Sequence, residues 1–312
     1  MTRALIFPGQ GSQYIGMGKS LANANADARS VFQEVDDALS QNLSKIMWEG
    51  DEDALRLTEN TQPALMAHSM AVIRILEKSG YTVSEIASHV AGHSLGEYSA
   101  LCAAGSFSLA DTARLLKLRG QAMQRAVPVG EGAMAAILGL ELLDIKVITD
   151  EACGDEVCVA ANDNAPGQIV ISGHKAAVER AIELAKEKGA KRGILLPVSA
   201  PFHCSLMQPA ADEMRGALAD VIIKAPSIPV IANVIAAPVE DVQVIRDLLV
   251  EQVTGSVRWR ETAASMQGLG IDKVVEIGAG KVLCGMIRRI DRELTTSNIQ
   301  DIEDIDAFLA SL

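Results

Sequence analysis

The pentapeptide Gly-His-Ser-Leu-Gly at 92–96, directly after the short apolar stretch 90–91, constrains the fold of this chain most strongly. A serine that attacks a carbonyl group must project from a tight turn between a strand and a helix. Side chains on both flanks would obstruct that turn, so glycines flank it. The next residues, 97–104, predict a helix whose first N–H groups face a developing oxyanion. The pattern indicates a nucleophilic Ser94, and an ordinary capped helix start is the alternative.

The composition limits the class of protein. The chain has 312 residues, 49% of them hydrophobic, which suits one large domain or a domain with an insertion. Its formal net charge of −12 argues against a nucleic-acid binder, because such a protein needs a basic surface. The five cysteines are irregularly spaced, and their odd number favours a reducing compartment.

The apolar stretches of the chain predict neither a signal peptide nor a membrane span. The first one ends after a few residues because Pro8 interrupts it, which is too short for a signal peptide. The uncharged stretch 193–211 contains several prolines and His203, which excludes a membrane-spanning helix. We therefore expect a cytoplasmic globular protein without membrane association, and a monomer by default.

Strands and helices alternate along most of the chain. A buried strand at 3–7 ends at Pro8, and the acidic segment 301–306 is expected to form a solvated helix face. The other predicted elements of this part are helices at 17–40, 63–78, 97–104, 111–126, 241–253 and 260–268 and strands at 229–234 and 273–277. This alternation predicts an α/β core with a mostly parallel sheet.

The segment from about 130 to 197 has a different order of elements. Strands are predicted at 133–138, 157–161, 168–172 and 194–198, with helices at 141–152 and between 174 and 189. This β-α-β-β-α-β order is the ferredoxin-like arrangement. Glycines at its start and prolines at its end indicate crossings between domains. We predict a small domain at 129–198, inserted into a large domain formed by 1–128 and 199–312.

The loop Phe-Pro-Gly-Gln-Gly-Ser-Gln at 7–13 follows the first predicted strand, where a dinucleotide site would lie. The spacing of its glycines does not fit such a site, and no Gly-Lys-Ser/Thr follows for a phosphate loop. Two interpretations stay open. The loop is a plain turn, or Gln10 and backbone N–H groups line a site for a polar or anionic group.

A serine hydroxyl needs a base to remove its proton. Three of the five histidines are explained as parts of predicted helices or strands: His68, His89 and His174. His93 is adjacent to Ser94, so we expect its ring to point away from the group that the serine presents. His203 lies on an irregular, uncharged, proline-rich segment at the predicted domain junction and is the best candidate, with a purely structural histidine as the alternative. No carboxylate is close to it in sequence, so a carbonyl or amide oxygen could orient the ring.

Arg119 has Leu115 and Met123 as its neighbours four residues away, so it shares a helix face with apolar side chains. One interpretation is a surface arginine whose stem lies along that apolar face. The other is a buried guanidinium that receives a substrate carboxylate through two parallel hydrogen bonds.

Several of these motifs together resemble the malonyl-CoA:acyl carrier protein transacylases. They are the 7–13 loop, Gly-His-Ser-Leu-Gly-Glu-Tyr at 92–98, Arg-Gly at 119–120, Asn-Asp-Asn-Ala-Pro-Gly-Gln at 162–168 and Pro-Phe-His-Cys at 201–204. The resemblance runs over nearly the whole chain. It implies a large α/β-hydrolase-like domain interrupted by a small ferredoxin-like one, in agreement with the predicted elements.

The resemblance also implies roles for individual residues. Ser94 is the acylated nucleophile, His203 its base, and the carbonyl of Gln252 orients the histidine. The implied oxyanion hole consists of Gln10 and the N–H of Leu95. Arg119 is implied to bind the malonyl carboxylate, with Asn162 and Met123 as further substrate-binding residues. Phe202 resembles the pattern associated with malonyl rather than branched acyl groups.

The function implied is transfer of a malonyl group from malonyl-CoA to the phosphopantetheine thiol of acyl carrier protein, for fatty acid synthesis. We expect no metal and no cofactor besides these substrates. A thioesterase with the same turn, a malonyl transferase for polyketide synthesis or malonate decarboxylase, and a non-catalytic acyl-CoA-binding subunit are the alternatives. The carrier is expected to be acidic, so basic pairs at 191–192 and 288–289 could form its docking patch.

Overall fold

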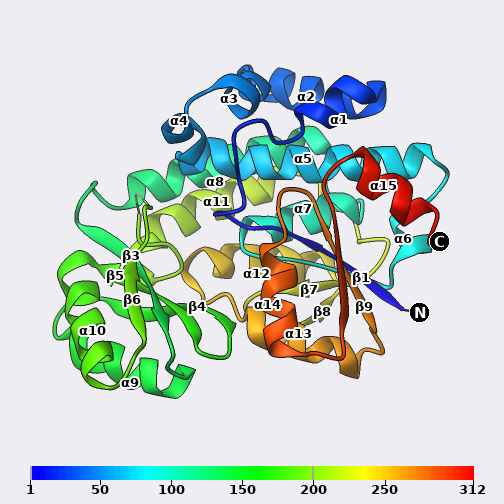
Figure 1. Ribbon diagram of the computed structural model, residues 1–312. Helices are drawn as coiled ribbons and strands as arrows, with labels where there is room; N and C mark the ends of the chain where they lie inside the picture. Colours follow the sequence, from blue (N-terminus) through cyan, green and yellow to red (C-terminus); the bar gives the residue numbers. More distant parts are fainter. Residues whose placement is uncertain (1, 199) are drawn as a thin grey trace.

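The computed structural model describes residues 2–198 and 200–312, which form two sheets with helices packed around them (Figure 1). The larger sheet and its helices come from two parts of the chain. The part before the smaller sheet contains β1 (Arg3–Phe7), α1 (Lys19–Ala24), α2 (Ala26–Leu39), α3 (Leu43–Glu49), α4 (Glu52–Arg56), α5 (Thr58–Lys78), α6 (Val83–Ile86), β2 (His89–Gly92), α7 (Leu95–Ala103) and α8 (Leu109–Ala126). The part after it contains a short 3₁₀ turn (Ser205–Met207), α11 (Gln208–Asp220), β7 (Val230–Ala232), β8 (Ala237–Val239), α12 (Val242–Thr254), α13 (Trp259–Gly268), β9 (Lys273–Ile277), α14 (Val282–Ile290), β10 (Thr295–Ile299) and α15 (Ile302–Leu309).

The larger sheet is mostly parallel, as the alternation of strands and helices predicts. Its strand order is β10-β9-β1-β2-β7-β8, and only the short edge strand β8 runs antiparallel to its neighbour among these. Side chains of β1 alternate between two cores. Leu5 and Phe7 pack with the helices that include α5 and α8, whereas Ala4 and Ile6 pack toward α13 and α14. Burial on both faces is the usual condition of a parallel strand.

Two predicted helices differ from the structure. The helix expected over 17–40 is divided at Asn25, because the Asn25 side chain accepts hydrogen bonds from the backbone N–H groups of Asp27 and Ala28 and so begins α2. The helix expected to begin at Pro63 begins at Thr58 instead. Thr61 donates to main-chain carbonyls of the preceding turn, which holds the polar first turn in place although Pro63 lies inside the helix. The helices α3 and α4 are not among the elements predicted from the sequence.

The smaller sheet is antiparallel, with strand order β4-β5-β3-β6, and it lies at the lower left of Figure 1. Its elements are β3 (Gly132–Leu138), α9 (Leu142–Cys153), β4 (Cys158–Ala165), β5 (Gln168–His174), α10 (Lys175–Glu187) and β6 (Arg192–Leu195). This order confirms the predicted ferredoxin-like arrangement. Along β3, Ala135 and Ile137 pack under α9 and α10, whereas Met134 and Ala136 face the pocket described below. One face of the small sheet therefore forms a wall of that pocket.

The division into a domain at 129–198 and another at 1–128 and 199–312 stays a prediction. Two of its boundary residues, Met1 and Ser199, lie outside the described residues. Within the described residues, none of the helices is both long and apolar enough to span a membrane. The acidic segment near the C-terminus is helical as predicted, and α15 buries Ile305 and Phe308 on its other face.

Candidate active site

Ser94 stands on a sharp turn between β2 and α7, at the carboxyl end of a central parallel strand. Its φ is +53°, a backbone conformation that L-residues rarely adopt. A Cβ atom on Gly92 would overlap the main chain of Gly96, and one on Gly96 would overlap the carbonyl of Phe7. Both flanking glycines are therefore required by close contact between backbones, as the sequence pattern predicts.

Asn233, at the end of β7, holds this turn on both sides. Its Oδ1 accepts a hydrogen bond from the backbone N–H of Ser94 at 2.7 Å, and its Nδ2 donates to the carbonyl of Gly92, also at 2.7 Å. The Asn233 side chain is fully buried. Sequence reasoning missed this residue, because no motif connects position 233 with the pentapeptide.

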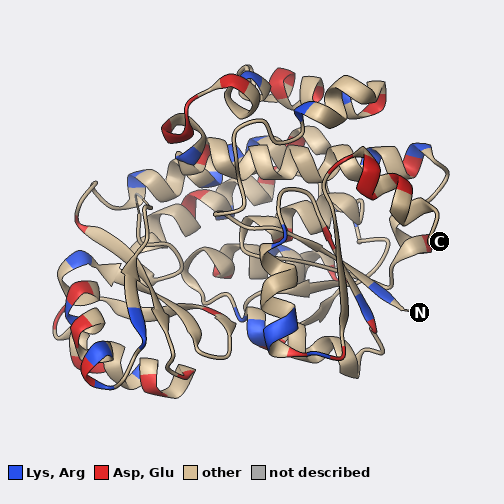
Figure 2. Cartoon of the chain, in the orientation of Figure 1, with Lys and Arg blue, Asp and Glu red and all other residues tan. Residues whose placement is uncertain are grey.

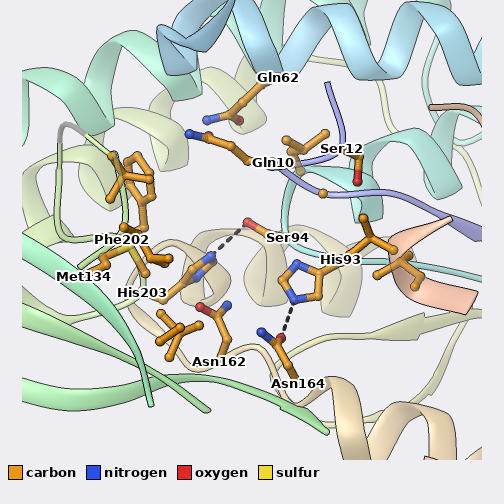
Figure 3. A pocket seen from close by; sticks show the side chains of 18 of the residues that line it. Gln10, Ser12, Gln62, His93, Ser94, Met134, Asn162, Asn164, Phe202 and His203 are labelled. Carbon is orange, nitrogen blue, oxygen red and sulfur yellow. Dashed lines mark hydrogen bonds between the residues drawn. The ribbon is translucent and has the colours of Figure 1, made fainter. Parts of the chain in front are cut away.

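The side chains of Ser94 and His203 meet across the pocket (Figure 3). Ser94 Oγ lies 2.9 Å from His203 Nε2, and His203 Nδ1 lies 2.9 Å from the main-chain carbonyl of Gln252 and 3.1 Å from that of Gly255. Carbonyl oxygens only accept, so Nδ1 carries the hydrogen and Nε2 presents its lone pair to the serine hydroxyl. This is the tautomer that a general base needs.

The surroundings of His203 keep its ring neutral. Burial, and then the nearby Arg119 cation, lower the pKa of His203 to about 3. A neutral imidazole can take the serine proton at any pH near neutrality. The resulting imidazolium would be disfavoured beside Arg119 unless a negative charge balanced the guanidinium.

Arg119 is buried, with a relative exposure of 1%, so the surface interpretation of this residue is wrong. Nη1 donates to Oε1 of Gln62 at 2.8 Å, and Nη2 donates to Oε1 of Gln252 at 2.8 Å and to Oγ of Ser94 at 3.1 Å. None of these acceptors is charged. A buried guanidinium without a carboxylate in hydrogen-bond contact is costly, and it is well placed to receive a carboxylate from a ligand.

Glu97 and the Gln252 side chain form a second buried layer behind Ser94. Nε2 of Gln252 donates to the carbonyl of Ser94 at 3.0 Å and to Oε2 of Glu97 at 2.8 Å. The same carboxylate oxygen accepts the backbone N–H of Asn233 at 3.0 Å. Burial raises the pKa of Glu97 to about 7. Sequence reasoning assigned Gln252 only its carbonyl and gave Glu97 no role.

Gln10 and Leu95, the two residues of the implied oxyanion hole, both line the pocket. Gln10 Oε1 accepts a hydrogen bond from Thr58 Oγ1 at 2.9 Å, which turns the amide nitrogen the other way. Leu95 is the first residue of α7, so its N–H has no carbonyl of the helix before it to bond. Both residues line the pocket, as an oxyanion hole requires.

The pocket lies between the two sheets, and Figure 3 shows Gln10, Gln62, Ser94, Phe202 and His203 around it. The other two implied substrate-binding residues, Asn162 and Met123, also line it. Val282, Leu283 and Met286 of α14 form an apolar part of the wall, and the small sheet contributes both apolar and polar side chains.

The expectation for His93 is wrong. Its ring lines the same pocket, and its Nε2 is 2.8 Å from Oδ1 of Asn164 (Figure 3). The expectation rested on the adjacency of the two residues in sequence, but the positive φ of Ser94 turns the chain immediately after His93. The pocket thus contains a hydroxyl, a neutral base, an amide side chain and a buried cation that is hydrogen-bonded to uncharged groups, which together suit transfer of an acidic acyl group.

Comparison with known proteins gives a consistent picture. The chain matches the acyl transferase domain family over residues 4–304. It is 46% identical to malonyl CoA-acyl carrier protein transacylase of Bacillus subtilis, an alignment that covers 99% of this chain and 96% of the relative.

Solved structures agree with this family match. An acyl-carrier-protein-S-malonyltransferase from Bartonella henselae superposes with a TM-score of 0.98 at 56% identity. The alignment covers 100% of this chain and 99% of the Bartonella chain. A malonyl-transacylase solved in complex with a type II polyketide synthase acyl-carrier protein gives a TM-score of 0.97 at 40% identity, with both chains covered completely. The chain therefore belongs to the acyl transferase family, and within it to the malonyl CoA-acyl carrier protein transacylases.

Proposed function

We propose that this chain transfers the malonyl group of malonyl-CoA to the phosphopantetheine thiol of acyl carrier protein through a malonyl ester on Ser94. The observation that carries the proposal is the buried Arg119, which contacts the serine hydroxyl and has only uncharged hydrogen-bond acceptors. The names of the relatives described above point to the same reaction and not to a thioesterase.

In the first half-reaction Ser94 Oγ attacks the thioester carbonyl while His203 Nε2 takes its proton. The Gln10 amide and the Leu95 N–H hold the resulting oxyanion. Each such donor contributes about 10²–10³ to the rate in comparable sites. When the tetrahedral intermediate collapses, the C–S bond breaks, His203 returns its proton to the sulfur, and coenzyme A leaves as a thiol.

In the second half-reaction the carrier's thiol takes the place of coenzyme A. His203 removes the thiol proton, the sulfur attacks the ester carbonyl, and the C–O bond to Ser94 breaks as the proton returns to Oγ. Ser94, His203, the Gln10 amide and the Leu95 N–H thus act in both half-reactions. A reversible transfer between two thiols of similar chemistry requires this.

Arg119 selects the acyl group. A malonyl carboxylate would form a buried ion pair with it, whereas an acetyl group would leave the guanidinium desolvated and without a partner. The malonyl carboxylate would also reduce the effect of the Arg119 cation on His203, which favours the imidazolium that forms during each attack. Asn162, Met123 and Phe202 complete the walls around the acyl group.

The pantetheine arm would enter along the apolar wall of α14. Figure 2 shows basic residues at one end of this helix, whose last turn contains Arg288 and Arg289. Arg288 bonds Oγ1 of Thr296, and Arg289 bonds Gln168 and the carbonyl of Pro166. These partners are uncharged and both arginines are exposed, so both are candidates for contact with an acidic carrier. We propose a cytoplasmic protein, since all five cysteines are unpaired, and a monomer by default. Fatty acid synthesis is the proposed pathway, and one structural neighbour was solved in complex with a type II polyketide synthase carrier.

Intact mass spectrometry tests the proposal. The protein is mixed with malonyl-CoA, and holo acyl carrier protein is then added. We expect a malonyl adduct on wild-type protein that maps to Ser94, is absent from Ser94→Ala, and moves to the carrier. An adduct that disappears in buffer alone would indicate a thioesterase, and no adduct would favour a binding subunit.

A further inference from the structure

We propose that Glu97 is a positioning residue for substrate selection: its carboxylate fixes the orientation of the Gln252 amide, and that amide holds Arg119 where the malonyl carboxylate binds. This inference rests on the function proposed above. It concerns a buried acidic side chain that the proposed reaction itself does not use.

The contacts of Glu97 are not those of a helix cap. Although it lies in the first turn of α7, Oε2 accepts from groups outside the helix, namely the backbone N–H of Asn233 at 3.0 Å and Nε2 of Gln252 at 2.8 Å. Its side chain is 3% exposed, and its two partners are fully buried. Burying a carboxylate in this way is expensive, so a purely local role in the helix does not explain it.

The Glu97 carboxylate is the stronger of two acceptors that determine which end of the Gln252 amide faces Arg119. An amide presents a donor at one end and an acceptor at the other, and only its partners distinguish the two orientations. Oε2 of Glu97 and the carbonyl of Ser94 both accept from Nε2, at 2.8 and 3.0 Å, which leaves Oε1 to accept from Nη2 of Arg119 at 2.8 Å. The reverse orientation would place Nε2 against the guanidinium, donor against donor.

The Arg119 nitrogen held in this way is the one that reaches the nucleophile. Nη2 lies 3.1 Å from Ser94 Oγ, and Nη1 is held independently by Gln62. Without Glu97, the Nε2 group of Gln252 would keep only the Ser94 carbonyl as an acceptor, so the amide would hold Nη2 of Arg119 less firmly, whereas Gln62 would still hold Nη1. An ion pair in which both guanidinium nitrogens bind the malonyl carboxylate would then be weaker. The attack of Ser94 on a neutral acyl group does not need this ion pair and would be unaffected.

The test compares kcat/KM for malonyl-CoA and acetyl-CoA, with holo acyl carrier protein as acceptor. Glu97→Leu removes the acceptor, and we expect the malonyl-to-acetyl ratio to fall about tenfold, as for the loss of one buried hydrogen bond of about 1.4 kcal/mol. Glu97→Gln keeps an acceptor oxygen for both partners, so the ratio should stay within about threefold of wild type. A Glu97→Leu variant with an unchanged ratio, or a Glu97→Gln variant that behaves like it, would overturn the proposal.

A matched control separates positioning from general destabilisation. Glu276 is fully buried, and its carboxylate accepts the backbone N–H groups of Leu283 and Cys284. We expect Glu276→Leu to lower stability and to change both substrates in proportion, so that the ratio stays constant. A ratio that falls equally in this control would show that Glu97→Leu acts only through stability.

The double variant Arg119→Ala/Glu97→Leu shows whether Glu97 acts through Arg119. Its ratio should equal that of Arg119→Ala alone, and a further fall would contradict the proposed route. The proposed function is tested separately, because a wild-type protein that transfers no malonyl group would refute that function before any Glu97 variant is measured. Normal wild-type transfer with an unaffected Glu97→Leu ratio would refute this inference alone.

Discussion

Nη2 of Arg119 donates a hydrogen bond to Oγ of Ser94 over 3.1 Å, so the group proposed to bind the substrate carboxylate also contacts the proposed nucleophile. The two side chains come from α8 and from the turn before α7. This contact places the acidic end of a malonyl group close to its own reacting carbonyl. It also places a buried cation close enough to influence the base, which leads to two of the predictions that follow.

Removal of the guanidinium should exchange one acyl preference for another. In Arg119→Ala we expect kcat/KM for malonyl-CoA to fall about a hundredfold or more, because a buried carboxylate would lose its partner. Acetyl transfer should be retained or increased, since no desolvated cation stays unpaired. Steady-state transfer to holo carrier protein measures both. Arg119→Lys, which keeps the charge without the fork, is expected to recover only part of the malonyl activity, and an unchanged malonyl preference in Arg119→Ala would refute the selection role.

The pKa of His203 should depend on Arg119. In wild-type protein burial and the Arg119 cation hold the pKa of His203 at about 3, so its ring stays neutral down to pH 5. In Arg119→Ala the pKa of His203 should rise because the cation is gone, but it should stay below 6.5 because burial, which is the larger cause, and His93 still oppose protonation. Ring ¹⁵N chemical shifts measured across a pH titration report this directly.

His68 provides the internal control for that titration. Its ring is buried against the carbonyl of Gln300, and burial lowers its pKa without any contribution from Arg119. Its resonances should titrate identically in both proteins. If His203 titrated near pH 6.5 in wild-type protein, the argument that Arg119 keeps it neutral would fail.

Stability should depend on pH through Glu97. Burial raises its pKa from the ordinary 4.5 to about 7, so the native state binds more protons than the unfolded chain between those values. The contribution of Glu97 to stability is therefore present at pH 4.5 and below, and it is lost as the pH rises to 7. Relative to wild type, Glu97→Gln should gain up to ~3 kcal/mol in the free energy of unfolding between pH 5 and pH 8. Urea denaturation at both pH values measures this difference. A Glu97→Gln variant that lost stability relative to wild type between pH 5 and pH 8 would contradict the raised pKa of Glu97.

The glycines of the turn differ from a glycine with space around it. A methyl group on Gly96 would meet the carbonyl of Phe7, so Gly96→Ala should lower the free energy of unfolding by more than about 2 kcal/mol and abolish acylation of Ser94. Gly216 lies on the exposed face of α11 with nothing near its Cβ position. Gly216→Ala should stabilise the protein by about 0.5–1 kcal/mol. Equal effects of the two substitutions in thermal and urea unfolding would disprove the steric argument.

The sequence carries local information, and this is the part that could be predicted. Alternating apolar segments predict the parallel sheet and the inserted antiparallel one, and glycine spacing predicts the turn at Ser94. Contacts between distant segments could not be predicted in this way. Glu97 meets Asn233 and Gln252 across separations of 136 and 155 residues, and no pattern in either segment indicates the pairing.

The errors in the predicted elements have the same origin. Asn25 interrupts a continuous apolar periodicity by capping α2 with its own side chain, which periodicity alone does not register. The prediction begins this helix at Pro63, yet the polar residues before it form the first turn of α5, where most of them are buried. In both places a specific side-chain contact outweighs the average preference of the segment.

The most direct test of the central claim is the fate of the isolated acyl-enzyme. Protein labelled with [¹⁴C]malonyl-CoA is freed of coenzyme A, divided, and followed by rapid quench with and without holo acyl carrier protein. The account predicts label on Ser94 that is stable in buffer and passes to the carrier thiol within a single turnover. Label that is released as free malonate at the same rate with or without the carrier would contradict it.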